Sequence, residues 1–251
     1  MTLLRSIAIY LVTLLWALVY WPMMLVPMII AGCLPAEHRR HWVRVMLLKF
    51  GRGTVRFMWR PFFKVEYLDR TGGIREPGIV VANHRSAIDA FLVSMPNLSL
   101  AQTVKGWPLR LPILGWVAKM AGYLNITNWD YETLTERSKS ILGIGDMIVS
   151  YPEGTRSESR QMNPFRSGAF RVAMDMKLPI YMLCIAGNQY MPDRKFRFRE
   201  FRDLKVRFLG PIPADEVQQC ATAYALKMKV FRIMNEELAS MDAELENEKQ
   251  L

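Results

Sequence analysis

The chain of 251 residues has few of the side chains that build disulfide or metal centres. Its three cysteines, Cys33, Cys184 and Cys220, are too few and too far apart for a disulfide framework or a zinc knuckle, so we expect a reducing, cytoplasmic setting. His38 and His41 stand three apart, but no cysteine or carboxylate lies at ligand spacing from them. We therefore interpret both as basic residues that face a membrane, and we predict neither a metal nor a cofactor.

Charge is absent from Ser6 to Ala36. This stretch is longer than the roughly 20 residues that span a bilayer and is too long for the apolar core of a signal peptide. Pro22 and Pro27 would kink a helix within it. Two arrangements agree with the pattern: one spanning helix over about Leu3 to Trp21 with a kinked extension, or a re-entrant helical hairpin in one leaflet. Either arrangement embeds the segment in a membrane.

Positive charge follows directly after the apolar segment. Residues 37–64 contain eight Lys or Arg against one Glu, which accounts for most of the formal net charge of +10. Five arginines in this region are spaced by four or eight residues: Arg40, Arg44, Arg52, Arg56 and Arg60. The spacing predicts a basic ridge on a helix that faces anionic lipid headgroups, although the solvated face of a packed helix would look the same.

The neighbouring apolar anchor favours lipid phosphate over nucleic acid as the anion, so we expect no nucleic-acid partner. The Lys/Arg bias after the segment places the rest of the chain on the cytoplasmic side of an inner membrane.

Short runs rich in β-branched residues alternate with helical stretches from Lys64 onward. The expected strands are Val65–Leu68, Ile79–Val81, Met147–Val149 and Ile180–Ile185. This alternation predicts an α/β fold with a mixed, partly parallel sheet flanked by helices, in which sites form at the carboxyl ends of strands.

The expected organisation has three parts. Residues 1–63 form membrane-embedded and basic interfacial helices, residues 64–215 form the α/β domain, and residues 216–251 form an amphipathic helix that packs on it. The apolar residues of that last helix keep a spacing of three or four: Val217, Cys220, Tyr224, Phe231, Met234, Leu238 and Met241. Its charged end, Glu244 to Lys249, is expected to fray.

Candidate chemistry begins where the second apolar run ends. His84 and Asp89 are separated by about 500 degrees of helix, so they cannot share a helical face. Ser86 and Asp89 have the Ser-x-x-acid form of a helix start, which leaves His84 in the loop and Asp89 in the first turn. The carboxylate would then hold one imidazole nitrogen and leave the other free to accept a proton. The spacing alone is equally satisfied if Asp89 only caps the helix.

A second polar turn, Tyr151–Ser157, follows the third apolar run. Gly154 lets the backbone approach an anion, and Arg156 offers a bidentate fork to phosphate, unless it forms a surface ion pair with Glu153 or Glu158. The chain has no Gly-x-Ser-x-Gly elbow, so the sequence does not call for a covalent nucleophile.

These motifs resemble those of the lysophospholipid acyltransferase family, to which the 1-acylglycerol-3-phosphate acyltransferases belong. The resemblance covers most of residues 75–190. It rests on the His-x4-Asp pair with Asn83, the Tyr151–Ser157 turn with Tyr for the usual Phe, Lys105-Gly106-Trp107-Pro108 with Pro112 and Gly115, Phe165–Phe170, and Leu178-Pro179-Ile180.

The resemblance implies transfer of a fatty acyl group from acyl-CoA or acyl carrier protein to the hydroxyl of a lyso-lipid, as in phospholipid biosynthesis. It makes His84 the general base, oriented by Asp89. The residues that it assigns to substrate binding are Glu153, Gly154, Thr155, Arg156 and Lys105.

Asn128 departs from the family pattern, because an arginine that helps to hold the acceptor phosphate usually falls there. This makes a different lyso-lipid or a lipid-like alcohol an alternative acceptor to lysophosphatidic acid. Two other functions fit the sequence less well: a membrane-anchored lipid-binding protein with a degenerate site, and a hydrolase that activates water.

A second basic stretch, Arg194 to Arg199, alternates charged and aromatic residues as an exposed strand does. It suits docking of an acidic carrier protein or of the CoA phosphates, or it is the solvated face of a strand.

Overall fold

The computed structural model describes residues 2–106, 108–110, 112–193 and 195–248. Within them lies a seven-stranded sheet with the order β1-β7-β6-β2-β5-β3-β4. Its strands are β1 (Val65–Arg70), β2 (Ile79–Ala82), β3 (Leu100–Val104), β4 (Leu124–Asn125), β5 (Met147–Ser150), β6 (Ile180–Ala186) and β7 (Leu204–Ile212). Neighbouring strands run parallel except β6 and β7, which are antiparallel. The predicted mixed, partly parallel sheet is therefore confirmed.

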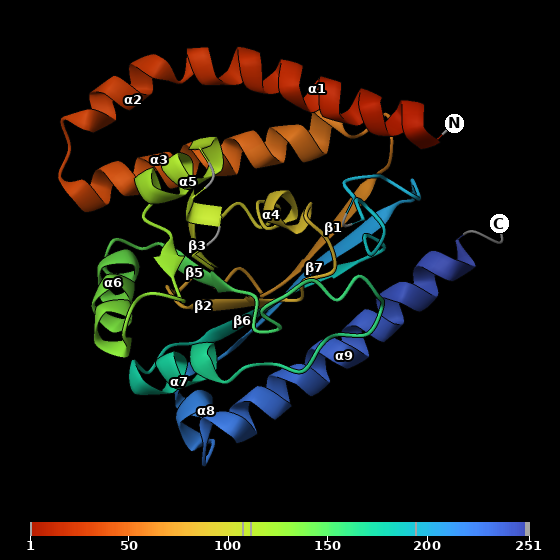
Figure 1. Ribbon diagram of the computed structural model, residues 1–251. Coiled ribbons are helices and arrows are strands. Elements are labelled where there is room, and N and C mark those ends of the chain that lie inside the picture. Colours follow the sequence, from red (N-terminus) through yellow and green to blue (C-terminus); the bar gives the residue numbers. More distant parts are fainter. Residues whose placement is uncertain (1, 107, 111, 194, 249–251) are drawn as a thin grey trace.

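Helices cover both faces of the sheet (Figure 1). They are α1 (Thr2–Met23), α2 (Leu25–Gly32), α3 (Ala36–Gly53), α4 (Asp89–Leu92), α5 (Pro112–Met120), α6 (Tyr131–Gly143), α7 (Gly168–Asp175), α8 (Ala214–Gln219) and α9 (Ala223–Asn247). A π-helical turn, Thr54–Met58, extends α3, and a 3-10 turn, Pro108–Arg110, precedes α5. Helices α7 and α9 lie on one face, while α3 and α4 lie on the other beneath α1.

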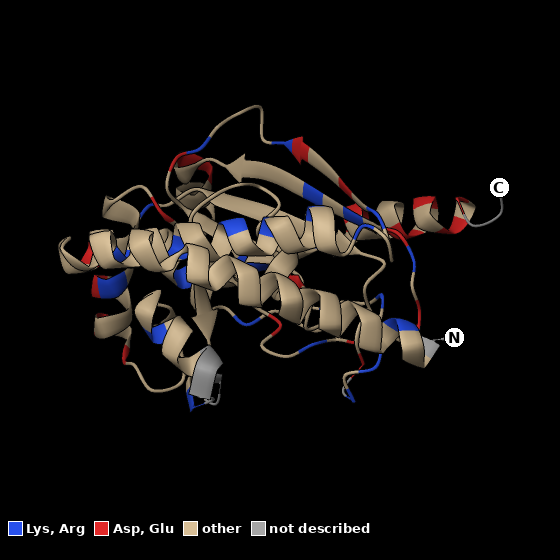
Figure 2. Ribbon diagram, turned by 90° about the horizontal axis from the view of Figure 1, so that it is seen from above, with Lys and Arg blue, Asp and Glu red and all other residues tan. Residues whose placement is uncertain are grey.

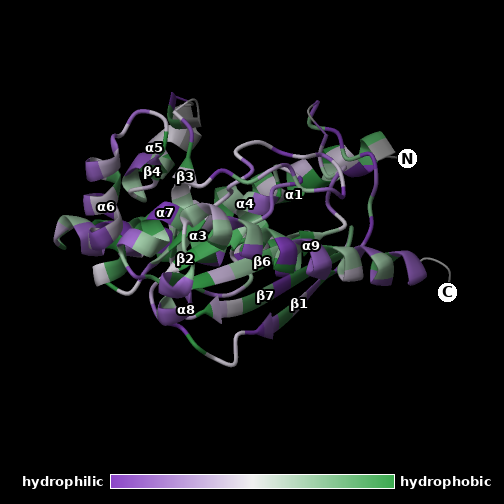
Figure 3. Ribbon diagram, turned by 90° about the horizontal axis from the view of Figure 1, so that it is seen from below, coloured by the Kyte–Doolittle hydropathy of each residue, from purple (hydrophilic) through white to green (hydrophobic). Residues whose placement is uncertain are grey.

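The central strands are apolar because both of their faces are covered. Every residue of β2 and β6 is buried, as expected for parallel strands between two helical layers. In Figure 3 these strands are green, whereas the arrow of the edge strand β1 is purple. One apolar cluster on each face joins the sheet to its helices.

The apolar N-terminal segment forms two successive helices that lie along α3. The inner side of α1 is tied to the rest of the protein: Ile9 is buried, Trp59 Nε1 donates to Thr13 Oγ1 over 2.9 Å, and the Tyr20 hydroxyl donates to the Met46 carbonyl over 2.7 Å. In the described part of the chain, one helix, Leu3–Met23, is long and apolar enough to cross a membrane.

The outer side of α1 and α2 is a continuous exposed apolar surface, which we call the outer face. Its residues are Leu3, Leu4, Ile7, Leu11, Leu14, Leu15, Leu18, Val19, Met23, Leu25, Val26, Ile29 and Ile30. Seen from above in Figure 2, this helix pair carries no charge beyond Arg5, whereas α3 behind it carries several cations.

The basic ridge predicted after Ala36 is wrong for Arg44, and the membrane-facing position predicted for His41 is wrong as well. Arg44 is buried, where its Nε donates to Asp146 Oδ2 over 2.7 Å and its Nη1 donates to the Ala121 carbonyl over 2.8 Å. His41 Nδ1 lies 2.6 Å from Asp146 Oδ1, so this ring is also held by Asp146 instead of facing headgroups. Asp146 is 105 residues from His41, which no local spacing reveals. Arg56 and Arg60 are exposed as expected.

Three expectations near the C-terminus also need correction. The amphipathic helix is interrupted between α8 and α9, and Tyr224 is 62% exposed. The charged end does not fray up to Asn247, because Glu244 is paired with Arg207; Lys249 lies outside the described residues. Residues 195–199 form a loop instead of a strand, and Arg194 lies outside the described residues.

Candidate functional site

The candidate residues gather at one edge of the sheet. Because β6, β2, β5, β3 and β4 are mutually parallel, their carboxyl ends meet at that edge. His84 follows β2, the Tyr151–Ser157 turn follows β5, and Lys105 follows β3. The same topology that makes the sheet parallel therefore brings together motifs that are far apart in the sequence.

His84 and Asp89 are in direct contact. His84 Nδ1 lies 2.8 Å from Asp89 Oδ2, and Asp89 is fully buried while the His84 side chain is 25% exposed. The same carboxylate oxygen accepts from the Ser86 backbone N–H over 2.9 Å. With Nδ1–H donating to this carboxylate, Nε2 has a free lone pair that is available to accept a proton.

The local backbone follows the predicted helix start in outline. His84 lies in the loop that follows β2, and α4 begins at Asp89. The Ser86 hydroxyl does not cap the helix; it donates to the Met191 carbonyl, while the Asp89 carboxylate receives the Ser86 N–H. Asp89 thus both orders the turn and holds the imidazole.

Asn83 and Asn188 fix the two sides of this pair. The Asn83 side chain exchanges hydrogen bonds with the Ile185 backbone over 2.9 and 2.8 Å, which joins the end of β2 to β6. The Asn188 amide donates to the second Asp89 oxygen, Oδ1. Asn188 was missed by sequence reasoning, although its place just after β6 is the kind of position at which such sites form.

The Tyr151–Ser157 turn holds the backbone of His84. Glu153 Oε1 accepts from the His84 N–H over 2.7 Å and Oε2 accepts from the Asn163 N–H over 2.8 Å. The Ser157 N–H donates to the His84 carbonyl over 2.8 Å. Burial raises the pKa of Glu153 to about 7, against the opposing effect of these hydrogen bonds.

Tyr151 packs against the imidazole, with ring centroids 4.6 Å apart. Its hydroxyl is buried and has no hydrogen-bond partner among the residues that the structure describes. Burial raises its pKa well above the usual range, so the phenol remains protonated at neutral pH.

Two arginines serve the same turn. Gly154 has φ +69°, and a Cβ there would lie 3.0 Å from Arg166 Nε, so a side chain would collide with this guanidinium. Arg156 is half-buried and Thr155 is exposed. In the sequence, Arg166 is marked only by its place in the Phe165–Phe170 motif.

Lys105 and Asn128 lie at the neighbouring part of this edge. Lys105 is half-buried, and the next residue, Gly106, donates its N–H to Thr127 Oγ1 over 3.2 Å. The Asn128 side-chain amide lies against Gly106, since a Cβ built on that glycine would be 3.6 Å from both Nδ2 and Oδ1. Trp107, part of the same motif, lies outside the described residues.

Arg85 connects the histidine loop to the last helix. This guanidinium is almost fully buried and pairs with both carboxylate oxygens of Asp242 on α9, over 2.8 and 2.7 Å. It also donates to the Arg160 carbonyl over 2.6 Å. The partner is 157 residues away in the sequence, so no local signal indicates it.

An apolar cavity of about 680 Å³ opens between helices α1 to α5 and strand β3. Its lining includes Ala90 and Phe91, directly after Asp89, together with Trp21 of α1, Leu25 of α2 and Trp116 of α5. A space of this size and polarity suits a hydrocarbon chain. Among the described residues no group of three or more His, Cys, Asp or Glu side chains is placed to hold a metal ion.

Comparisons with known proteins give consistent matches. Residues 63–186 match the family model described as Acyltransferase. The chain is 25% identical over 158 residues to a chloroplastic 1-acyl-sn-glycerol-3-phosphate acyltransferase of Brassica napus, covering 61% of this chain and 46% of that protein. It is 26% identical over 148 residues to the human 1-acyl-sn-glycerol-3-phosphate acyltransferase alpha, covering 56% and 51%. The chain thus spans about half the length of the curated relatives it matches.

A solved structure shares the fold. The crystal structure of the 1-acyl-sn-glycerophosphate acyltransferase from Thermotoga maritima superposes with a TM-score of 0.76 at 18% sequence identity. The match covers 96% of this chain and 97% of that one, so the N-terminal helices and α9 are included in the common fold.

Proposed function

We propose that this chain, which belongs to the lysophospholipid acyltransferase family, moves a fatty acyl group from a thioester donor to the hydroxyl of a lyso-lipid acceptor. The observation that carries the proposal is the His84–Asp89 contact with Nε2 left free. Ala90 and Phe91, which directly follow Asp89, line an apolar cavity. In this proposal Asp89 orients His84, His84 accepts the proton of the acceptor hydroxyl, and the cavity holds the fatty acyl chain.

The proposed reaction needs no covalent intermediate on the protein. His84 Nε2 takes the proton of the acceptor hydroxyl as its oxygen attacks the thioester carbonyl. A C–O bond forms, the C–S bond breaks, and the imidazolium returns the proton to the departing thiolate. Asp89 stabilises the imidazolium through Nδ1, and Asn188 and the Ser86 N–H hold Asp89 in place.

The donor is acyl-CoA or acyl carrier protein, since both present the same activated thioester. The acceptor is a lyso-lipid of the lysophosphatidic acid type, the substrate class in the names of the relatives. Lys105, Arg156 and the turn of Glu153, Gly154 and Thr155 bind its headgroup, and Arg166 adds a charge beside Gly154. With Asn128 in place of an arginine, a lyso-lipid with another headgroup is the alternative acceptor.

The proposed position is on the cytoplasmic side of an inner membrane, with the outer face of α1 and α2 in the lipid. The inner side of α1 packs on the protein through Ile9, Thr13 and Tyr20, which favours a helix pair lying in one leaflet over a helix that crosses the bilayer. Anionic lipids are the expected membrane partner of the exposed arginines that follow.

The test is the transfer rate of the purified protein with a His84→Ala substitution. A general base contributes about 100-fold to 10,000-fold, so the rate should fall at least about 100-fold, and Asp89→Asn should lose less. His38→Ala, which changes an exposed histidine on α3, is the matched control and should keep the full rate. A His84→Ala protein that retains more than roughly a tenth of the rate would exclude the general-base role. Thiol release that proceeds without any acceptor would point to a hydrolase.

A further inference from the structure

The loop of residues 195–199 presents an aromatic side chain between cations. Lys195, Arg197 and Arg199 are exposed, and Phe196 is 65% exposed although it is a large apolar residue. Phe196 has φ +56°, a left-handed conformation that is unfavourable for a bulky side chain. The protein thus holds the Phe196 ring in solvent in a strained backbone conformation, and this strain is not offset by burial of the ring.

The loop is built around one buried carboxylate. Asp193 accepts from the backbone N–H groups of Lys195 and Arg197 over 2.8 and 3.0 Å, and from Arg199 Nε over 2.7 Å. These hydrogen bonds lower the pKa of Asp193 to about 2, and the one from the Arg197 backbone has the largest effect. Asp193 is therefore ionised at neutral pH and fixes the shape of the loop. The Lys195 side chain is exposed, and the Arg197 guanidinium lies 3.8 Å from Asp193 Oδ2 but is 54% exposed.

The loop is attached to the membrane-facing helix. The Phe198 N–H donates to Ser6 Oγ over 3.2 Å, and the Tyr10 hydroxyl donates to the Phe196 carbonyl over 2.8 Å. The rings of Tyr10 and Phe198 meet edge to face with centroids 5.6 Å apart. The exposed ring of Phe196 therefore lies beside the N-terminal half of α1, whose outer face is apolar and whose Arg5 adds another exposed cation.

We propose that the 195–199 loop is a second membrane contact, in which Phe196 enters the headgroup region and Lys195 and Arg197 bind anionic lipids. An aromatic ring flanked by cations, continuous with an apolar helix, has the composition of an interfacial anchor. The alternative occupant, an acidic carrier protein, matches the cations but not an apolar ring that adjoins the outer face. The inference rests on the proposed membrane position of α1.

The first experiment reports contact directly. Phe196→Cys carries an environment-sensitive fluorophore in the full chain, in a background with Cys33→Ser and Cys220→Ser; Cys184 is fully buried and stays. The matched control is Tyr224→Cys on α9, an exposed aromatic position on the opposite face of the sheet. Vesicles of phosphatidylcholine mixed with phosphatidylglycerol should shift the emission of the residue 196 probe to the blue and leave that of residue 224 unchanged.

Two results would overturn the inference. If the protein floats with vesicles while the residue 196 probe keeps its emission in water, the loop does not touch lipid. If that probe instead responds to acyl carrier protein without vesicles, the loop is a protein-docking site. Failure of the whole protein to float would reject the membrane position itself, and none of these readouts depends on acyl transfer.

The second experiment tests the charge. Each Lys or Arg at an anionic surface is worth about five-fold in binding, so Lys195→Gln with Arg197→Gln should weaken binding to phosphatidylglycerol-containing vesicles about 25-fold. Binding is measured at a salt concentration where it is partial. Lys227→Gln with Arg232→Gln on α9 removes the same charge from the opposite face and should change binding less than about two-fold. Equal losses in both double variants would mean that only net charge matters.

Discussion

At the scale of single residues, Glu153 is a carboxyl group whose pKa burial raises to about 7 while its oxygens hold two backbone N–H groups. The native state therefore binds a proton between pH 4.5 and 7 that the unfolded state has released. Stability should fall as pH rises through that interval, by about 3 kcal/mol in total, because ionising the buried acid costs free energy.

Glu153→Gln removes this titration. The stability of the natural protein relative to the variant should decline from pH 4.5 to 7 and level off above, measured by denaturant unfolding at a series of pH values. Glu132→Gln, an exposed acid on α6, is the control that should show no such slope. A natural protein that gains stability against the Gln variant over the same interval would contradict the raised pKa.

Asn128 gives a prediction about acceptor choice. If the side chain replaces a phosphate-binding arginine, Asn128→Arg should restore a charged hydrogen bond worth about 1.5 to 3 kcal/mol, or roughly ten-fold to more than a hundred-fold in acceptor use. The measurement is kcat/KM across lyso-acceptors for both proteins, with a selective rise for lysophosphatidic acid. The idea fails if the natural protein already prefers lysophosphatidic acid to every other acceptor.

Residue-level predictability follows sequence distance. His84, Asp89 and Glu153 could be identified because each lies in a short motif directly after an apolar run. Asn188 could not, since its Asp89 contact spans 99 residues and a single asparagine carries no pattern. The catalytic and binding roles of these residues stay predictions until the variants are measured.

At the scale of secondary structure, α9 supports the histidine loop from the far side of the sheet. Asp242→Asn would leave the buried Arg85 guanidinium without its counter-charge, which should destabilise the fold by about 3 kcal/mol. It should also lower kcat on the order of 10-fold with little change in KM, because the base is displaced while the acceptor and acyl sites remain.

Glu246→Gln on the same helix is the control, since its partner Arg160 is exposed and the pair should contribute less than about 1 kcal/mol. Thermal unfolding and steady-state rates of both variants, compared below the unfolding temperature, separate position from simple loss of folded protein. An Asp242→Asn protein with unchanged kcat would show that Arg85 is only structural.

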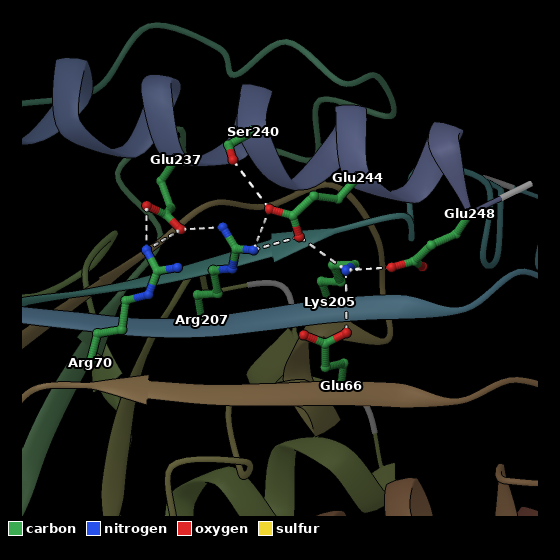
Figure 4. A network of polar contacts seen from close by, with 8 residues as sticks. All are labelled: Glu66, Arg70, Lys205, Arg207, Glu237, Ser240, Glu244 and Glu248. Carbon is green, nitrogen blue, oxygen red and sulfur yellow. Dashed lines mark hydrogen bonds and ion pairs between the residues drawn. The ribbon is translucent and has the colours of Figure 1, made fainter.

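Helix α9 is also joined to the edge of the sheet by a network of ion pairs (Figure 4). Glu244 accepts from Arg207 over 2.6 Å and from Lys205 over 3.0 Å, and Glu237 joins Arg207 to Arg70 on β1. The hydrogen bonds from Arg207 lower the pKa of Glu244 to about 2. The pair therefore stabilises the protein above pH 4.5 and loses its contribution as pH falls towards 2.

Glu244→Gln should lower stability at neutral pH by no more than about 1 kcal/mol, since the Glu244 side chain is 38% exposed and solvent screens its charge. The difference should shrink in acid unfolding as pH falls through the interval. Glu236→Gln, an exposed acid on the same helix, should have no effect at either pH. A constant difference at all pH values would assign the loss to packing instead of charge.

The strands show why the sheet was only partly predictable. Strands β2, β5 and β6 are buried along their whole length and are mostly apolar, which is the pattern of a strand covered on both faces. Strand β7 contains the buried cations Lys205 and Arg207, so its sequence does not have the apolar pattern of a buried strand. Both cations are paired with glutamates of α9, which the local sequence does not reveal. Strand β4 is two residues long, too short for any periodicity.

At the scale of the whole molecule, the outer face of α1 and α2 gives the protein one exposed apolar side. Replacing Leu11 and Leu15 on the outer face with Gln should weaken vesicle binding by about ten-fold or more for each leucine, with little loss of folding stability. Vesicle flotation with increasing lipid measures the binding, and thermal unfolding in detergent measures the folding stability.

Thr13→Ala is the opposite control on the inner side of the same helix. It removes the acceptor of the Trp59 indole, so it should cost about 1 kcal/mol of stability and leave vesicle binding unchanged. If both sets of variants alter binding equally, the outer face is not the surface that meets the lipid. The sequence left a crossing helix and a hairpin both open, because an apolar run does not reveal the contacts that α1 makes with Met46 and Trp59.

The Arg85–Asp242 pair has a consequence for the order in which the protein is made. A chain emerges from the ribosome from its N-terminus, so α1 is synthesised while β7 and α9 are still untranslated. Until they appear, β1 has no neighbouring strand and Arg85 has no counter-ion. The Arg85 side chain can gain its counter-ion only after Asp242 has been translated, so the histidine loop takes its final, fully supported form when synthesis is nearly complete.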